Sequence, residues 1–385
     1  MRTFEELREL TDRPLRATPF YGNHREQGAT LFLSGEWVRA LEYDGLGATA
    51  EHRACRSHAG LFDVSSIGKL AICGPGARSM LNRAMTRDIR ALRPGRGAYT
   101  CACDERGRIL ADPIVYCCSE SHFYVTVSGA QSGELADWLR RLASREVTIE
   151  DRTVSLAYLA VQGPAARQVL ASICGGLDLS SAALPYFSCA EARIASVPTL
   201  LCRTGYTGEA GYELNFSAEY GAHMWSELLA AGESSGLVPC GAMALQTLRL
   251  EKAYPGYGWD LSVDNDPFEA GLGWTVEFDS GDFIGRKALL TASERLPRRR
   301  LLPIRFEART TMVQAGDAIE LDGRTVGRVT SALFGPTVNA WIGLALVDSS
   351  VRPGEMVSSI GPDRTAVGTI ANGAFYDPEG NRLRA

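Results

Sequence analysis

A carboxylate beside aromatic side chains and turn residues gives this chain the parts of a site for a flat heterocycle. Glu213 follows the segment 203–212, which holds three glycines and two tyrosines, and it opens the strand-like run Glu213–Phe216. A carboxylate fixed in this way accepts two parallel hydrogen bonds from adjacent N–H groups. Tyr206 offers a flat face nearby, and the glycines let the backbone approach a ligand closely. The alternative is a hairpin turn with incidental charges.

A second carboxylate has a position that suits proton transfer. Asp112 lies in the segment Gly107–Tyr116, inside an otherwise apolar run that we expect to be a strand. Apolar surroundings disfavour the ionised form, so burial raises the pKa of an aspartate towards neutrality. A group with such a pKa serves as a general acid or base. The alternative is a turn aspartate that precedes Pro113.

Regular elements that position these side chains alternate along the first three quarters of the chain. Helical spacing of apolar residues predicts helices over 77–84, 132–143, 165–173 and 223–231. Alternating patterns predict strands over 66–73, 98–103, 109–117, 122–127, 155–161, 192–202 and 213–216. Strands and helices that alternate in this way indicate two α+β units folded against each other.

The pattern changes after the charged, proline-containing segment 294–300. Beyond it the sequence predicts short strands, and Asp322-Gly323 is a hairpin signal. We therefore expect residues 1–293 to form the two α+β units and residues 301–385 to form a β-barrel or jelly roll. The predicted strands of this last region cover residues 302–306, 318–321, 324–330, 342–347 and 356–360.

Composition excludes several classes of protein. The chain has 385 residues, 45% of them hydrophobic and 22% charged, with a formal charge of −5. This acidic balance argues against binding to nucleic acid or to an anionic membrane, and the basic run Arg298–Arg300 is too short to change that. No stretch approaches the roughly 20 apolar residues of a membrane span. We expect a cytoplasmic protein.

The cysteines predict neither disulfides nor a metal site. Ten cysteines are scattered through apolar runs, which is typical of reduced core residues. The Cys101-Ala-Cys103 and Cys117-Cys118 spacings differ from the CxxC pairs of zinc sites. We expect no metal. The sequence also lacks a dinucleotide-binding GxGxxG after a strand, a P-loop and a Ser-His-Asp arrangement.

Six sequence blocks carry a resemblance to a known family. They are Gly60–Ser65, Val161–Pro164, Arg203–Leu214, Leu248–Glu251, Asp282–Gly285 and Val329–Ser331. Through these blocks, which occur in the family's order, the chain resembles the aminomethyltransferase family, which includes the T-protein of the glycine cleavage system and related folate-dependent demethylases. The resemblance implies an α+β fold of three domains in a cloverleaf around a central hole, with two interleaved α+β units and a C-terminal β-barrel. Tetrahydrofolate, or its 5-methyl or 5,10-methylene derivative, would bind in the hole.

The resemblance also implies roles for individual residues. Asp112 matches the catalytic aspartate near folate N10, although Ala111 replaces the aspartate that precedes it in the family. Glu213 matches the acceptor for the pterin edge, and Tyr257 and Asp260 would face the substrate. The remaining predicted folate contacts are Tyr206, Tyr99, Trp274, Ile67 and Val127.

One departure from the family bears on the reaction. Glycine-cleavage T-proteins carry an Arg-Asp pair where this chain has Leu245 and Gln246. Leucine cannot replace arginine in binding an anion. The segments 244–252 and 257–260 resemble more closely the folate modules of sarcosine and dimethylglycine dehydrogenases. We therefore expect a tetrahydrofolate-dependent transferase that moves a methyl or methylene group between folate and a small molecule's N, O or S atom.

Two alternatives remain open. One is a glycine-cleavage aminomethyltransferase that acts on a lipoyl carrier protein, a partner that Leu245 and Gln246 argue against. The other is a folate-binding assembly factor for iron–sulfur proteins. Such factors carry a cysteine in the block after the arginine–glutamate helix, and the segment 252–258 has none.

Overall fold

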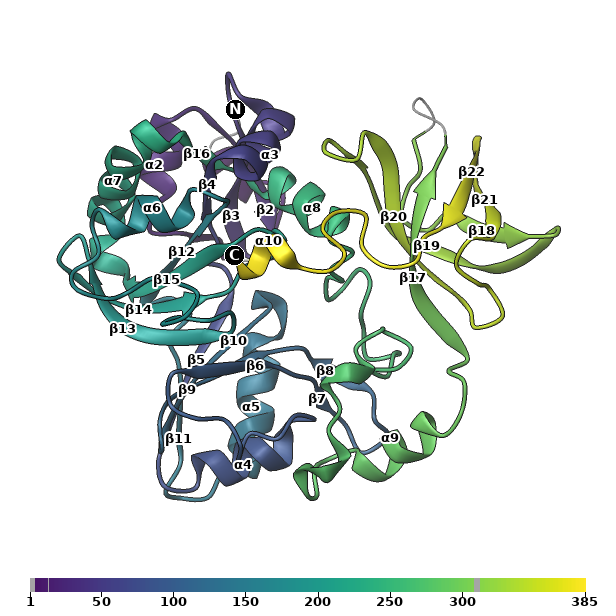
Figure 1. Cartoon of the computed structure of the whole chain (residues 1–385), viewed down its shortest axis with the longest axis horizontal. Coiled ribbons are helices and arrows are strands. Elements are labelled where there is room, and N and C mark those ends of the chain that lie inside the picture. The colour runs from purple at the N-terminus through teal and green to yellow at the C-terminus, as the bar shows by residue number, and fades with distance from the viewer. Residues whose placement is uncertain (1–3, 13, 308–311) are drawn as a thin grey trace.

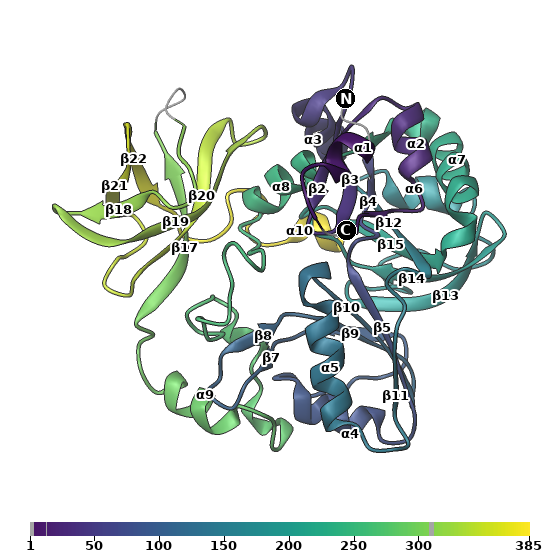
Figure 2. The same cartoon turned by 180° about the vertical axis from the view of Figure 1, so that it is seen from behind.

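Three lobes surround the centre of the molecule in the computed structural model, which describes residues 4–12, 14–307 and 312–385. Two lobes share one long sheet, and the third is a β-barrel (Figures 1 and 2). The C-terminal helix α10 (Asn381–Arg384) lies near the centre. The predicted α+β cloverleaf with a C-terminal barrel is confirmed. Residues 1–3 and 13 of the first predicted range, and 308–311 of the second, lie outside the described residues.

The long sheet contains eleven strands. Strands β16 and β4 pair in parallel, and the other neighbouring strands of this sheet, as far as the structure describes them, pair antiparallel. In spatial order the strands are β11 (Thr148–Asp151), β5 (Gly68–Cys73), β10 (His122–Val127), β9 (Ile114–Ser119), β6 (Arg96–Tyr99), β13 (Ser188–Ile194), β14 (Val197–Arg203), β15 (Gly211–Ser217), β12 (Leu156–Gln162), β4 (Ala59–Asp63) and β16 (Leu237–Cys240).

Amphipathic helices cover each half of this sheet. In the lower lobe of Figure 1, α4 (Ala77–Ala84) and α5 (Ser132–Leu142) bury apolar side chains such as Leu81 and Leu139 against β5, β9 and β10. In the upper lobe, α2 (Tyr21–Glu26), α6 (Ala166–Ala171) and α7 (Gly221–Gly232) surround a second core that includes Trp225. Burial of each such large side chain contributes roughly 1.5–3 kcal/mol.

The remaining elements complete the two lobes. The upper lobe carries a small sheet, β1 (Arg16–Ala17), β3 (Trp37–Tyr43) and β2 (Ala29–Ser34), and the helices α1 (Phe4–Arg8), α3 (Gly47–Ser57) and α8 (Ala242–Glu251). The lower lobe carries the pair β7 (Ala102–Cys103) and β8 (Ile109–Ala111), and α9 (Arg286–Ser293). Short 3-10 helices occupy Gly129–Gln131, Ala218–Tyr220, Glu233–Ser235, Gly273–Thr275 and Phe278–Ser280.

The chain passes between the lobes more than once. Strand β4 lies in the upper half beside β12, whereas β5, five residues later, lies in the lower half beside β10. The sheet is therefore built from interleaved segments. The turn that joins β4 to β5 sits where the two halves meet.

The third lobe is a closed barrel followed by a returning segment. Its strands, in spatial order, are β17 (Arg299–Phe306), β20 (Ala340–Asp348), β19 (Arg324–Gly335), β18 (Ala318–Leu321), β21 (Met356–Gly361) and β22 (Arg364–Ile370). The sequence patterns had not indicated β22, and β19 extends five residues beyond its predicted end. After β22 the chain runs back to the upper lobe, where the N–H groups of Phe375 and Tyr376 donate to the Glu251 carbonyl.

Three sequence-based strand predictions were wrong. The segment 98–103 is divided into β6 and β7, which belong to different sheets. The segment 192–202 is a hairpin of β13 and β14, because Ala195 and Ser196 both adopt positive φ, at 46° and 70°. The segment 109–117 is divided into β8 and β9 at Asp112 and Pro113. Proline has no N–H to give to a neighbouring strand and restricts the residue before it. Asp112 therefore lies at a break between strands rather than inside one.

All ten cysteines are free thiols. Among the described residues, no helix is long and apolar enough to cross a membrane, and no group of three His, Cys, Asp or Glu side chains is arranged to hold a metal ion.

Candidate active site

Glu213 lies in the middle of the long sheet, on β15 between β14 and β12. Its side chain is 8% exposed. The Thr204 and Tyr158 hydroxyls both donate to the same oxygen, Oε2, at 2.5 and 2.7 Å. Burial raises the pKa of Glu213, while those two hydrogen bonds act in the opposite direction. No described residue donates a hydrogen bond to Oε1, so one carboxylate oxygen is fixed and the other stays free.

Tyrosine hydroxyls hold the surroundings of Glu213 in place. The Tyr116 hydroxyl lies 2.8 Å from the Thr204 hydroxyl, and Tyr124 donates to Asn215 Oδ1 at 2.6 Å. Burial raises the pKa of Tyr116, Tyr124 and Tyr158, so these groups remain neutral hydrogen-bond donors at ordinary pH. The carboxylate thus has a rigid and neutral environment.

Asp112 lies half-buried at the strand break. The Tyr99 hydroxyl donates to its Oδ2 at 2.8 Å. Burial raises the pKa of Asp112 to about 6, although the bond from Tyr99 opposes the rise. At neutral pH the group is mainly ionised, yet it can take up a proton at little cost.

Predicted aromatic residues gather around Asp112. Burial raises the pKa of Tyr99, Tyr206 and Tyr257, and the negative charge of Asp112 adds to the rise in each case. The Tyr99 ring lies 5.9 Å from the ring of Trp274, which is 58% exposed. These four rings therefore form a wall that leads from the solvent to Asp112.

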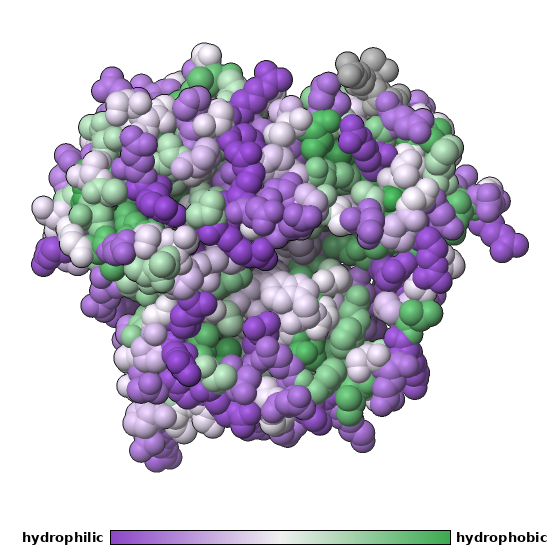
Figure 3. All heavy atoms as spheres, viewed as in Figure 1, coloured by the Kyte–Doolittle hydropathy of each residue, from purple (hydrophilic) through white to green (hydrophobic). Residues whose placement is uncertain are grey.

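Tyr206, one of these four rings, is also close in sequence to Thr204, which donates to Glu213. It stands two residues after Thr204, its ring stacks on Tyr254 at 5.8 Å, and its hydroxyl donates to the Pro255 carbonyl at 2.6 Å. Tyr206 thus lies two residues from the threonine that holds Glu213 and close enough to Asp112 for that charge to raise its pKa. In the space-filling view the surface is hollowed near its centre, where the lobes meet (Figure 3).

The two remaining predicted folate contacts, Ile67 and Val127, lie in different parts of the structure. Ile67 packs beside the buried cluster that contains Tyr158 and Ala160, close to Glu213. Val127 pairs with Gly68 across β10 and β5 and is buried in the lower-lobe core.

Hydrogen bonds from the protein itself fill the acceptor positions of the Asp260 carboxylate. Its Oδ2 accepts bonds from the Arg249 guanidinium at 2.8 Å and from the Gly256 N–H at 2.9 Å. Its Oδ1 accepts bonds from the hydroxyls of Thr330 and Ser331 at 2.5 and 2.7 Å. A carboxylate has about four acceptor positions, so Asp260 ties α8 and its following loop to the barrel. Only Tyr257 of the two predicted substrate-side residues lies beside Asp112.

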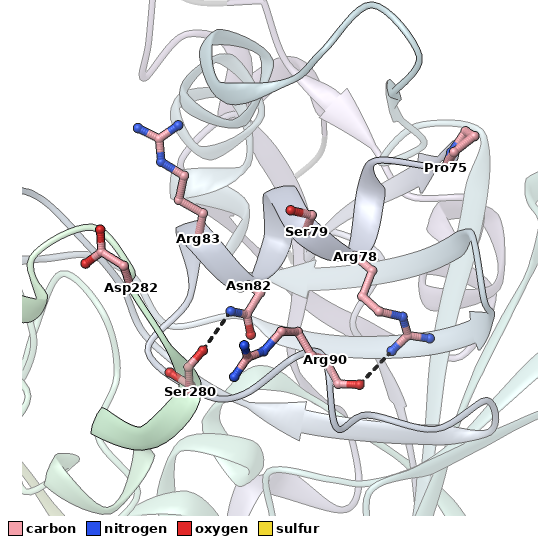
Figure 4. Close-up of a pocket in the computed structure, with 8 residues that line it drawn as sticks. All are labelled: Pro75, Arg78, Ser79, Asn82, Arg83, Arg90, Ser280 and Asp282. Carbon is pink, nitrogen blue, oxygen red and sulfur yellow. Dashed lines mark hydrogen bonds between the residues drawn. The ribbon is translucent and has the colours of Figure 1, made fainter.

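A separate pocket of about 530 Å³ lies in the lower lobe, beside α4 (Figure 4). Its arginines are largely engaged: Arg78 donates to the carbonyls of Ile89 and Leu92 and pairs with Glu120, and Arg90 pairs with Asp88. None of the predicted site residues lines this pocket.

Sequence reasoning missed the residues that hold Glu213. Thr204 lies within the turn-rich segment 203–212, and its hydroxyl next to Arg203 is the signal that could have been noted. Tyr158 lies on a strand that reads as ordinary apolar core, and only the register of β12 against β15 brings it to Glu213.

Comparison with known proteins fits this geometry. The profile of the GCVT N-terminal domain matches residues 20–280, and that of the glycine cleavage T-protein C-terminal barrel domain matches residues 299–377. The chain belongs to the glycine cleavage T-protein family. Members of this family act on tetrahydrofolate, and the chain is accordingly a folate-dependent transferase.

Several relatives are similar over nearly their whole length. The aminomethyltransferase of Parafrankia sp. (strain EAN1pec) is 38% identical over 94% of this chain and 98% of its own. That of Halothermothrix orenii is 33% identical over 94% of this chain and 100% of its own. The crystal structure of the glycine cleavage system aminomethyltransferase T from Bartonella henselae superposes with a TM-score of 0.86, at 28% identity over 94% of this chain and 99% of that one.

The names of these relatives bear on the reaction. They favour the aminomethyltransferase alternative over the expected transfer of a methyl group to or from a small molecule. They give no support to the iron–sulfur assembly factor.

Proposed function

We propose that this T-protein family member is an aminomethyltransferase that delivers a one-carbon unit to tetrahydrofolate from an aminomethyl group on a lipoyl carrier protein. The names and near-complete coverage of its relatives support this reaction. The observation that carries the assignment of the site is Glu213, whose Oε2 is held by two hydroxyls while its Oε1 is left free.

The residues around Glu213 fit a reduced pterin. A pterin presents adjacent N–H donors at one edge, and a half-fixed carboxylate without competing protein donors is suited to accept them. When bound, the folate supplies nitrogen atoms that accept the one-carbon unit. Glu213 would bind and orient the pterin, and Tyr206 and Ile67 would line its faces.

Asp112 would act at the other end of the site. In its ionised form the carboxylate stabilises positive charge that develops on the transferred group, and with a pKa of about 6 it can take up and return a proton. Tyr99 holds its Oδ2, while Trp274 and Tyr257 would limit access of water.

Reconstitution tests this function directly. The chain would be mixed with tetrahydrofolate and a lipoyl carrier protein loaded with an aminomethyl group, and the folate product and released ammonia would be measured. We expect product with the loaded carrier and none with the unloaded carrier. Lack of turnover in the presence of measurable tetrahydrofolate binding would contradict the aminomethyl reaction.

The departure at Leu245 favours a second candidate function. This residue packs beside the apolar cluster that includes Ile67 and Tyr158, in place of the arginine of glycine-cleavage T-proteins. An apolar wall suits a small methylated substrate better than an anionic one. Transfer of a methyl group to tetrahydrofolate from an N-, O- or S-methylated small molecule, without any carrier protein, would establish this candidate instead.

A further inference from the structure

A buried lysine lies behind the proposed pterin site, and the mechanism above does not use it. Lys69 lies on β5, and its side chain is completely inaccessible to solvent. Lysines are rarely fully buried without partners, because removing an ammonium group from water is costly. The buried ammonium of Lys69 therefore needs hydrogen-bond acceptors within the protein.

The partners of Lys69 are the carbonyls of the turn that joins β4 to β5. Its ammonium donates to the Ser65 carbonyl at 2.7 Å and to the Ile67 carbonyl at 2.9 Å. Two of its three donors thus fix the backbone on either side of Ser66. Ile67 is the apolar residue of this turn that packs against the cluster containing Tyr158, and in the proposed site it would line the pterin.

Tyr158 connects the same ammonium to Glu213. Lys69 Nζ lies 5.7 Å from the centre of the Tyr158 ring, within the range of a cation–π interaction. The Tyr158 hydroxyl in turn donates to Glu213 Oε2. The turn also docks on this residue, because Ser65 Oγ accepts a bond from the Tyr158 N–H at 3.0 Å.

We propose that Lys69 is a positioning residue for the pterin: it fixes the Ile67 wall and the Tyr158 hydroxyl relative to Glu213, without itself touching the ligand. This inference rests on the proposed function, because it assigns a role within the same site. Lys69 acts on the pterin end alone. Asp112 and the aromatic wall lie on other segments, and within the part of the chain that the structure describes the Lys69 ammonium contacts the Ser65 and Ile67 carbonyls and the Tyr158 ring instead.

A fragment-binding experiment separates this role from general stabilisation. Calorimetry would measure the affinity of wild type and Lys69→Met for tetrahydrofolate, for a tetrahydropterin without the tail, and for p-aminobenzoylglutamate, which lacks the pterin. Lys287→Met, at an exposed lysine on α9, is the matched control. We expect Lys69→Met to weaken tetrahydrofolate and tetrahydropterin about tenfold, or about 1.4 kcal/mol, with p-aminobenzoylglutamate and the control unchanged.

Two results would overturn the proposal. One is an unchanged affinity for tetrahydropterin in folded Lys69→Met. The other is an equal loss for both fragments, which would indicate general loosening. Failure of wild type to bind tetrahydrofolate at all would instead refute the proposed function, and this role with it.

The wild type offers a second test if Lys69→Met does not fold. Burial lowers the pKa of Lys69 to about 7, opposed by the charges of Asp63 and Asp151, and the Tyr158 ring that faces it stays neutral. Lys69 is therefore charged at pH 6 and largely neutral at pH 8.5. Tetrahydropterin affinity should fall as pH rises through about 7, whereas p-aminobenzoylglutamate affinity should not follow that curve. A flat tetrahydropterin profile would contradict the proposal.

Discussion

At the scale of single residues, the two acids of this site differ in burial and in hydrogen bonding: Glu213 is buried and Asp112 is half-buried. Glu213 has fixed neutral donors on one oxygen and sits on a regular strand, which suits a permanent acceptor. Asp112 has one tyrosine partner, a pKa of about 6 and a position at a strand break. Perturbed pKa values of this kind are common at functional sites.

Replacing the catalytic candidate should separate activity from stability. Asp112→Asn keeps the size and the bond to Tyr99 but removes the charge, so we expect turnover to fall by about 10²–10⁴-fold. The folded state raises the pKa of Asp112, so the ionised form costs stability. The variant should therefore be more stable by about 1–3 kcal/mol at pH 7.

Thermal unfolding at two pH values checks the second half of this prediction. The gain should be present above pH 6 and should vanish below about pH 4, where Asp112 is protonated in both the folded and the unfolded state. Tyr99→Phe is a useful comparison, since it removes the hydrogen bond and keeps the charge. Unchanged turnover in Asp112→Asn with normal folate binding would remove its catalytic role.

The pH dependence of wild-type activity follows from the same group. If the ionised carboxylate is required, kcat/KM should fall about tenfold per pH unit below pH 6 and should level off above pH 7. Initial rates with saturating carrier between pH 5 and 8 would show this limb. An acid limb centred near pH 4 would mean that the active group is not the buried Asp112.

The sequence supported prediction of the acids and of Tyr99 beside Asp112, but not of the residues that hold Glu213. Glu213 and Asp112 stand out as charges in apolar or turn-rich surroundings, and the motif supplies Tyr206. Tyr158 and Lys69 are separated from Glu213 by more than fifty residues along the chain, and only strand register brings them to it. The family resemblance implied that Asp260 faces the substrate, and no sequence pattern reveals that hydroxyls of the barrel fill two of its acceptor positions.

At the scale of elements, the patterns located most helices and strands but missed backbone conformations that the residue types disfavour. The predicted bounds of α4 and β10 match the observed ones. The hairpin of β13 and β14 carried no signal, because Ala195 and Ser196 take the place of the glycine or asparagine that usually adopts positive φ. A turn that lacks its usual residue types cannot be predicted from the sequence.

This turn gives a stability prediction. Ser196 has a φ of 70°, which costs a non-glycine residue energy and glycine almost nothing. Ser196→Gly should therefore stabilise the protein by about 0.5–1 kcal/mol, measured by chemical denaturation. Ala190→Gly, on β13 with ordinary φ, is the control and should destabilise by a similar amount. Loss of stability in both variants would show that the turn is not strained.

At the scale of the whole molecule, hydrogen bonds to a buried charge cluster of the upper lobe join the barrel to that lobe. Glu251 on α8 accepts a bond from the Thr337 N–H of the barrel at 2.8 Å, pairs with Arg56 at 3.0 Å and lies 3.3 Å from His52, whose pKa is lowered by burial. Burial opposes ionisation of Glu251, but His52, Arg56 and the backbone donor lower its pKa to about 2. The central site lies between the parts that this network holds together.

Removing the charge of Glu251 should loosen the docking of the barrel. Glu251→Gln leaves the buried Arg56 with Glu209, at 3.0 Å, as its remaining carboxylate partner, so we expect a loss of about 1–3 kcal/mol. Because the folded state lowers the pKa of Glu251, its contribution should be present above about pH 4.5 and disappear towards pH 2. Thermal unfolding of this variant beside Glu294→Gln, an exposed control, measures the effect. Equal midpoints would exclude a structural role for the network.

The most direct test of the central claim is calorimetric titration of tetrahydrofolate into wild type, Glu213→Gln and the exposed control Glu219→Gln. Glutamine keeps the oxygen that Thr204 and Tyr158 bind but presents an N–H₂ group where the pterin donors need an acceptor. We predict binding about 10–100-fold weaker in Glu213→Gln, with wild-type affinity in the control. Equal affinity in all three proteins would contradict a pterin bound at Glu213.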